Sequence, residues 1–412
     1  MYRNKFGTLE LTFYARTKKT RIMKKNIYIT CFLILTTVSL KAQNNIENVL
    51  SDIVKNNKSI ISNQQFWEAK KLLYKTGLTP ENPKFEYENL RGNNGNQVDY
   101  YIVQSFDFPT AYIKKNQVAN RQVSQSNFKE DAFRQDILLK AKQYCLTLIF
   151  LNKKQTELTK RAENASKVHT AYQQKMAIGD ATILDVNKTK LQLLNAENSM
   201  RINQSEIDLY NQRLTELNGG VSVLLSNNSY PLTPILPAYE TLEAAIEEAD
   251  PNLKSIHQQN EIDQKKLELS RAMSLPKFEG GYRSQDFAGQ TIQGIHLGIT
   301  IPLWENKNKV KHQKAHLKFN DLQVLEHQNE HHNEIKQLYQ KYTSLSIAID
   351  AYKQVMGTVN NNQLLNKALD LGEISSLQYF MELNYYYASY DTFLDLENDY
   401  YQVLAELNKY KL

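Results

Sequence analysis

Two stretches of the chain alternate between apolar residues and small or polar ones, a period of two that predicts β-strands with one apolar face. One stretch ends at residue 301 and the other ends 193 positions earlier, at residue 108. The apolar positions on this face are Ile295, Leu297, Ile299 and Ile301 in the later stretch, and Ile102, Phe106 and Phe108 in the earlier one.

Each alternating stretch has a partner strand before it, so the pattern predicts two β-hairpins. The partners begin at Lys84 and Lys277 and extend to about residues 90 and 282, with turn-prone residues at 92–95 and 286–289. Strands of about ten residues suit a tilted crossing of a bilayer in a β-barrel. A soluble β-sandwich with one buried face is the alternative, although four strands are few for a two-sheet core. Because lipid excludes open sheet edges, the barrel interpretation requires an oligomer.

Long segments without glycine or proline follow the hairpins. They cover residues 110–178, 181–218, 303–356 and 373–412, and their composition predicts helices. The first would be about 100 Å long if unbroken, which exceeds any single globular core. We therefore expect helices packed side by side as coiled coils. The apolar seam of the first helix is expected at Ile137, Ala141, Tyr144, Leu148 and Leu151.

The chain repeats itself at a distance of 193 residues. The tetrapeptide Pro-Lys-Phe-Glu at residues 83–86 recurs at 276–279, and Gly179 recurs as Gly372. This period is far longer than a solenoid unit, so each copy is a whole structural half. We expect a first repeat at residues 43–220, a linker at 221–237 and a second repeat at 238–412.

Residues 1–42 are predicted to be a secretory signal that is cleaved after export. Lys24 and Lys25 precede an apolar run at residues 27–38, and Ala42 precedes the expected cut. A transmembrane anchor is the alternative, but the apolar run is short for a bilayer crossing. The basic, unpatterned 22 residues before Met23 are interpreted as the product of an upstream start codon.

Removal of the signal changes the charge of the chain. The whole chain carries a formal charge of +6, but residues 1–42 hold nine of its 50 basic and one of its 44 acidic side chains. The remaining 41 basic and 43 acidic residues give −2, so charge gives no support for nucleic-acid binding. Cys145 is the only cysteine after residue 42, which excludes an internal disulfide and a cysteine-based zinc site.

The order and duplication of these elements resemble the TolC family of outer-membrane efflux channels, from about Ile46 to the C-terminus. The motifs are Asn-Pro-Lys-Phe-Glu at 82–86, Gln-Ser-Phe-Asp-Phe-Pro at 104–109 and Ile-Thr-Ile-Pro-Leu-Trp at 299–304. The form of residues 82–92, and the Phe-Pro-Thr-x-Tyr run ending at Tyr112, are most similar to the heavy-metal (CusC/CzcC-type) branch.

The resemblance implies a mainly α protein with a pair of membrane β-hairpins. Three copies would form an α-helical periplasmic tunnel topped by a barrel of twelve strands, four from each copy. The implied function is the outer-membrane exit duct of a tripartite RND-type efflux system that exports heavy-metal cations. Its partners would be a second and third copy, a periplasmic adaptor, an inner-membrane RND pump and outer-membrane lipid, with no cofactor.

Two helical turns are the candidate functional sites. Glycine permits the positive φ of a tight turn, and Thr182 and Ser375 can cap the helices that follow. The candidate residues are Gly179, Asp180, Thr182, Leu184, Asp185, Val186, Gly372, Glu373, Ser375, Ser376 and Leu377. The resemblance implies that these tips bind the adaptor and carry an acidic pore constriction, although capping alone also explains their sequence.

Two histidine pairs, His312/His316 and His327/His331, have the i, i+4 spacing that can chelate a metal on one helix face. Their neighbours are Lys, Gln, Asn and Glu, which indicate a solvated helix face, and no third ligand is fixed. We therefore assign no metal site.

Two other functions remain open. A drug-efflux or type I secretion duct would differ only in its partners, and an exported coiled-coil scaffold would not enter the membrane. No nucleophile, phosphate loop or acid–base pair suggests an enzyme.

Overall fold

The computed structural model describes residues 45–412, except 93–94, 233–234, 288 and 358–360. The predicted signal at residues 1–42 lies outside the described residues. Residues Ile46–Leu412 form one compact unit of helices and a single sheet. None of the described helices is both long enough and apolar enough to span a bilayer.

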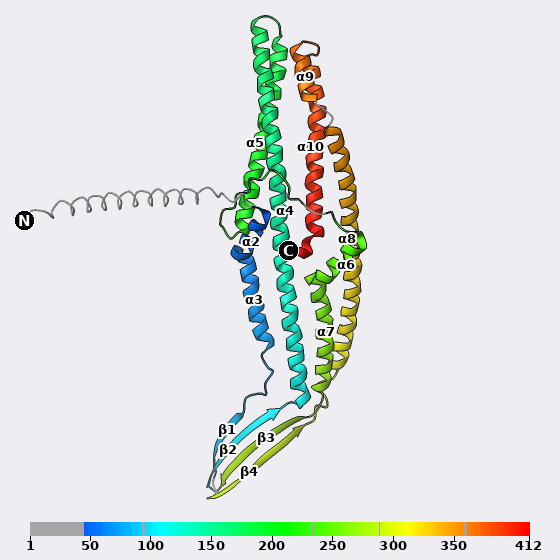
Figure 1. Ribbon diagram of the computed structural model, residues 1–412. Coiled ribbons are helices and arrows are strands. Elements are labelled where there is room, and N and C mark those ends of the chain that lie inside the picture. Colours follow the sequence, from blue (N-terminus) through cyan, green and yellow to red (C-terminus); the bar gives the residue numbers. More distant parts are fainter. Residues whose placement is uncertain (1–44, 93–94, 233–234, 288, 358–360) are drawn as a thin grey trace, which may run out of the picture. The chain divides into compact units, whose positions relative to one another are not determined.

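The two halves of the unit have the same order of elements, except that two helices, α8 and α9, stand in the second half where the first half has α4 (Figure 1). The first half contains α2 (Ile46–Asn56), α3 (Lys58–Tyr74), β1 (Lys84–Gly92), β2 (Gly95–Phe106), α4 (Pro109–Ala177) and α5 (Ile183–Leu217). The second contains α6 (Tyr239–Ala249), α7 (Pro251–Ala272), β3 (Lys277–Phe287), β4 (Gln290–Thr300), α8 (Lys309–Met356), α9 (Asn361–Asp370) and α10 (Ser376–Leu407), followed by a 3₁₀ turn at Lys409–Lys411. The element pairs α2/α6, α3/α7, β1/β3 and α5/α10 each begin 193 positions apart.

The predicted long helices are present, with corrections at their ends. Residues 303–308 were expected to be helical but form turns, and α8 begins only at Lys309. Asn308 has a φ of 68°, and the Asn306 side chain donates to the Met273 carbonyl at 2.6 Å. Asparagine tolerates this left-handed conformation, so a helix can be stopped without glycine or proline. Residues 373–375 and 408–412 likewise lie outside α10.

The four strands form one antiparallel sheet in the order β1-β2-β3-β4. Its central pair, β2 with β3, joins the two halves, and Ile102 lies opposite Tyr282. Asp286 and Phe287 belong to β3, so the second turn is shorter than the expected 286–289. The two predicted hairpins are therefore a single sheet with β1 and β4 at its edges.

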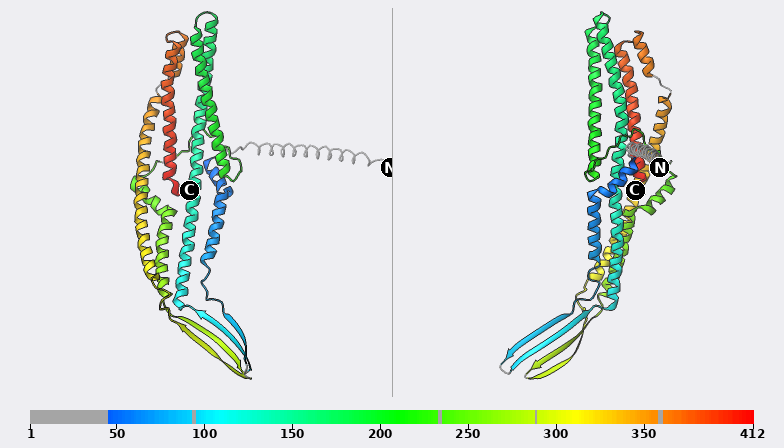
Figure 2. Two further views of the ribbon diagram at one scale, coloured as in Figure 1. Left: turned by 180° about the vertical axis from the view of Figure 1, so that it is seen from behind. Right: turned by 60° about the vertical axis from the view of Figure 1, so that its left-hand side comes forward.

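Helix α4 is the central packing element of the unit. It packs along α5 and α7, while α10 packs against both α4 and α8 (Figure 2). Ala141, Leu148 and Leu151 of α4 are buried with Ile53 and Leu214, and Ile137 and Tyr144 pack against this cluster. The predicted apolar seam is confirmed.

The segment between the halves packs against the helices along part of its length. Val223 and Leu225 are buried in the same cluster as the α4 seam. The Tyr230 ring stacks on Tyr401 of α10, with centroids 4.0 Å apart. This predicted linker therefore contributes to the core.

Candidate functional site

The first helical turn connects α4 to α5 and is built by local hydrogen bonds. Gly179 has a φ of 86°, which lets the Asp180 amide donate to the Lys175 carbonyl at 2.8 Å. Thr182 caps α5: its hydroxyl oxygen accepts from the Asp185 amide, and the Asp185 carboxylate accepts from the Thr182 amide, both at 3.2 Å. The Thr182 hydroxyl also donates to the Asp185 carboxylate at 2.6 Å, and this bond, followed by that from the Thr182 amide, lowers the pKa of Asp185. The acidic tip residue is therefore held ionised by its own turn.

The second turn connects α9 to α10 and has the same construction. Gly372 has a φ of 73°, and the Glu373 amide donates to the Ala368 carbonyl at 2.9 Å. Ser375 caps α10 by accepting from the Gln378 amide at 3.3 Å, while the Gln378 side chain accepts from the Ser375 amide at 3.0 Å. The two capping boxes differ in charge, because Asp185 is replaced by neutral Gln378.

The tip residues divide into exposed and buried groups. Leu184 and Leu377 are exposed, whereas Val186 and Ser376 are buried. Ser376, at the start of α10, adds to the lowering of the Asp185 pKa, so the two turns lie close to each other. Only the exposed group is available to a partner on a single copy.

A contact behind the tips was not expected from the sequence. Tyr379 of α10 is fully buried, and its hydroxyl donates to Asn366 at 2.6 Å and accepts from Asn164 of α4 at 2.8 Å. Its nearest sequence neighbours give no sign of these partners, which come from two other helices.

The sheet lies at the other end of α4 and has two chemically different faces. One cross-strand row consists of Phe85, Ile102, Tyr282 and Ile295, all exposed and all on one face. Leu297 and Ile299 extend this apolar face along β4. Phe106 lies opposite Phe278 on the same face.

The opposite face of the sheet carries charges. Arg283 donates to Asp99 at 3.0 Å, and His296 lies 3.0 Å from Glu279. The Tyr101 hydroxyl donates to Glu279 at 3.4 Å. This alternation is typical of a strand pair with lipid on one side and water on the other.

Two residues expected on the strands lie beyond them. Phe108 is the N-cap of α4, because β2 ends at Phe106, and Ile301 follows the last residue of β4, Thr300. Proline follows each of them, at Pro109 and Pro302, and proline lacks the amide needed to continue the ladder. The apolar period therefore runs slightly past the hydrogen-bonded strands.

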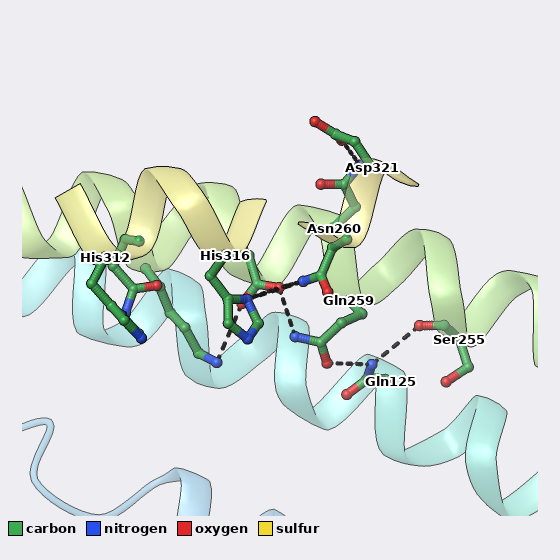
Figure 3. A network of polar contacts seen from close by, with 11 residues as sticks. Gln125, Ser255, Gln259, Asn260, His312, His316 and Asp321 are labelled. Atoms are coloured by element: carbon green, nitrogen blue, oxygen red, sulfur yellow. Dashed lines mark hydrogen bonds and ion pairs between the residues drawn. The ribbon is translucent and has the colours of Figure 1, made fainter. Parts of the chain in front are cut away.

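The two histidines of each pair lie close together on one helix face, and one of each pair, His316 or His331, has a carboxylate partner. The His312 and His316 rings lie 6.1 Å apart, and His316 Nδ1 is 3.3 Å from the fully buried Asp263 carboxylate (Figure 3). His327 and His331 lie 5.8 Å apart, and His331 Nε2 is 3.2 Å from Asp250. The hydrogen bond to Asp250 raises the pKa of His331. Within the described ranges no three His, Cys, Asp or Glu side chains are placed to hold a metal ion.

No protein-family model and no curated protein sequence matches the chain. Solved structures do match its fold. A crystal structure of CusC, described in terms of transmembrane channel formation, has a TM-score of 0.75 at 15% identity, over 90% of this chain and 92% of that one. The CmeC outer membrane channel of Campylobacter jejuni has a TM-score of 0.67 at 14% identity, over 89% and 85%. The open MtrE outer membrane channel of Neisseria gonorrhoeae has 0.64 at 12% identity, over 89% and 88%.

The CmeC and MtrE structures are outer membrane channels, and all three structures match almost the whole described part of this chain. The chain has the fold of TolC-family channels, as its strand and turn motifs predicted.

Proposed function

We propose that the chain is the outer-membrane exit duct of a tripartite efflux system. The observation that carries this proposal is a four-stranded sheet with one apolar face, placed at one end of α4, with the two capped turns at the other. At about 1.5 Å per residue, the 69 residues of α4 separate these ends by about 100 Å. A membrane segment and a distant docking tip are what a duct across the periplasm requires.

Three copies would close the barrel. The edge strands β1 and β4 have no further strand beside them in the described part of the chain. An unpaired edge is excluded in lipid, so β1 of one copy would pair with β4 of the next. Ile102, Phe106, Ile295, Leu297 and Ile299 would face lipid, with Phe108 and Ile301 where the chain leaves the membrane. Asp99 and Arg283 would face the water-filled lumen.

Cross-linking tests this assembly without assuming a register. The double variant Asn89→Cys, Gln293→Cys places one thiol on each edge strand, and the native Cys145 is buried. A bifunctional maleimide should link these edges into a ladder that stops at three chains. Each single-cysteine variant is the control and should stay monomeric on the gel. A ladder that continues past three chains would exclude the closed trimer.

The tips would dock a periplasmic adaptor that connects to an inner-membrane RND pump. Leu184 and Leu377 supply exposed apolar surface, and Asp185 supplies one fixed charge for each copy. Val186 and Ser376 would support the turns from behind. Pull-down of the adaptor should be weakened by Leu184→Ser and unaffected by Leu191→Ser, an equally exposed leucine further along α5.

Heavy-metal cations are the proposed cargo. The sequence form of residues 82–92 and the similarity to CusC support this choice over a drug-efflux or secretion duct. A deletion strain should become sensitive to metal salts and be rescued by the wild-type chain but not by Gly179→Pro. Sensitivity to drugs alone would favour the drug-efflux alternative, and a protein released from membranes by carbonate would favour the scaffold.

A further inference from the structure

A cluster of exposed lysines lies where the chain leaves the sheet and enters α8. Lys307, Lys309, Lys311 and Lys314 are all exposed. In the described part of the chain, none of them has an ion pair or a side-chain hydrogen bond, and the neighbouring Glu305 is 3.3 Å from Lys277. Four positive charges therefore lie within eight residues of the chain without a carboxylate partner.

In the first half of the chain, the basic residues at the corresponding place form ion pairs. Three of them lie at the corresponding place, near the start of α4, and each has a carboxylate partner. The pairs are Lys114–Glu268 at 2.6 Å, Lys115–Asp107 at 2.8 Å and Arg121–Glu261 at 2.9 Å. The lysine cluster of the second half thus differs from the corresponding place in the first half, where the basic side chains are paired.

Helix stability does not account for this cluster. Positive side chains in the first turn oppose the positive end of the helix dipole. The first turn of α8 contains no acidic residue, and Asn308 makes no side-chain cap hydrogen bond. Lys309 and Lys311, which lie in the first turn of α8, are therefore placed against the electrostatic preference of their own helix.

An apolar surface lies directly beside the lysines. Ile301, Leu303 and Trp304 are 60%, 68% and 80% exposed and continue the apolar residues of β4 past its end. Tryptophan is enriched at the boundary between lipid tails and headgroups. Lysine stems lie along apolar surface while their ammonium groups reach the headgroups. The combination is complementary to an anionic lipid surface.

We propose that Trp304 and the cluster of Lys307, Lys309, Lys311 and Lys314 bind the headgroups of anionic phospholipids in the membrane leaflet at the helical end of the sheet. This proposal rests on the membrane placement in the proposed function. The bound lipids would fix the depth of the sheet on the β4 side, where the described residues provide no carboxylate partner for these four lysines.

The two tryptophans of the chain, Trp67 and Trp304, make a direct test available. The full chain carrying Trp67→Phe is reconstituted into vesicles of phosphatidylethanolamine and phosphatidylglycerol, with bromine on the tails of one lipid or the other. Quenching of Trp304 by brominated phosphatidylglycerol should correspond to an enrichment of this lipid near Trp304 of about five-fold over its share in the vesicle. One lysine in contact with an anionic membrane surface contributes about this much.

Two triple variants compare the lysine cluster with other lysines on the same helix. Lys307→Gln, Lys309→Gln, Lys311→Gln leaves one lysine of the cluster and should remove most of the preference for the anionic lipid. Lys336→Gln, Lys341→Gln, Lys353→Gln removes three exposed lysines further along α8 and should preserve it.

The outcomes distinguish the lipid site from the membrane placement on which it rests. Equal quenching by both brominated lipids would overturn the lipid site while leaving the membrane placement intact. Absence of quenching by either lipid would overturn the membrane placement itself. If the first triple variant lost heat resistance as an assembled trimer but kept its lipid preference, the lysines would bind carboxylates of a second copy instead.

Discussion

Arg161 of α4 donates two hydrogen bonds to the Asp391 carboxylate of α10, at 2.9 and 2.7 Å. The Arg161 side chain is only 10% exposed, and its guanidinium lies 4.2 Å from the centre of the Tyr387 ring. Burial opposes the charge, but the hydrogen bonds and charge of Asp391 outweigh it and raise the pKa of Arg161. This pair fixes the first helical hairpin to the second, behind the tips.

Asp391→Asn should lower the free energy of unfolding by about 1–2 kcal/mol, because a largely buried guanidinium loses its charged acceptor. Urea unfolding followed by circular dichroism measures the change. Asp131→Asn is the control: its 3.9 Å pair with Arg134 is exposed, and its loss should cost less than about 0.5 kcal/mol. Equal losses in the two variants would contradict a special role for the buried pair.

The His331–Asp250 pair should make stability depend on pH. The hydrogen bond to Asp250 raises the pKa of His331 despite burial, and Glu334 and Glu247 raise it further. Burial raises the pKa of Asp250, but hydrogen bonds from His331 and the Asn252 backbone outweigh it, so that pKa is lowered. The His331 contribution is therefore lost as pH rises through its raised pKa, and the Asp250 contribution is lost as pH falls through its lowered pKa.

The wild-type chain should thus unfold at a lower urea concentration at about pH 8 than at about pH 6. His331→Gln should reduce this difference. His312→Gln should retain it, because His312 is exposed and has no ion pair in the described ranges. If the His331→Gln variant kept the wild-type difference between about pH 6 and about pH 8, the His331–Asp250 pair would not be the source of the pH dependence.

The caps at the tips can be tested by amide exchange. Thr182→Ala removes the acceptor of the Asp185 amide and should cost about 1 kcal/mol locally, a roughly five-fold faster exchange in the first turn of α5. Thr182→Ser keeps the hydroxyl and should exchange like the wild type. Similar exchange in Thr182→Ala and Thr182→Ser would mean that the cap does not stabilise this turn.

Two adjacent glycines of β3 differ in the space available for a side chain, so their variants can test whether assembly requires the pairing of β2 with β3. A Cβ at Gly281 would lie 2.4 Å from the Ile102 carbonyl oxygen, whereas a Cβ at Gly280 would meet nothing within 4 Å. Gly281→Ala should therefore separate β2 from β3 and abolish the heat-resistant assembled band on gels, while Gly280→Ala should preserve it. Retention of that band in Gly281→Ala would show that the strands can shift without loss of assembly.

Features that depend on neighbouring residues could be predicted from the sequence. The caps involve residues three positions apart, such as Thr182 with Asp185, and the strands follow a period of two. The ends of the strands and helices could be predicted less well. Proline stopped the strands before Phe108 and Ile301, and Asn308 stopped a helix in a segment without glycine or proline.

Features that depend on distant residues could not be predicted. Arg161 and Asp391 are 230 positions apart, and nothing in either local sequence indicates the other. The i, i+4 spacing of the histidines on α8 could be identified in the sequence. Their partners could not, because Asp250, which pairs with His331, is the N-cap of α7, and Asp263, which pairs with His316, lies in its interior. Val186 and Ser376 were grouped with the tip by position, and only the packing of neighbouring helices shows that they are buried.

The pairing of β2 with β3 leaves both outer edges of the sheet open on a single copy. Each edge is a row of free backbone donors and acceptors beside an apolar face, a template on which any extended chain can add. If three copies close the proposed barrel, a newly exported copy would be aggregation-prone until it meets two others. Because this closure would need three copies at once, the yield of assembled channels should fall more steeply than the expression level, and the misassembled fraction should be largest when export outpaces insertion.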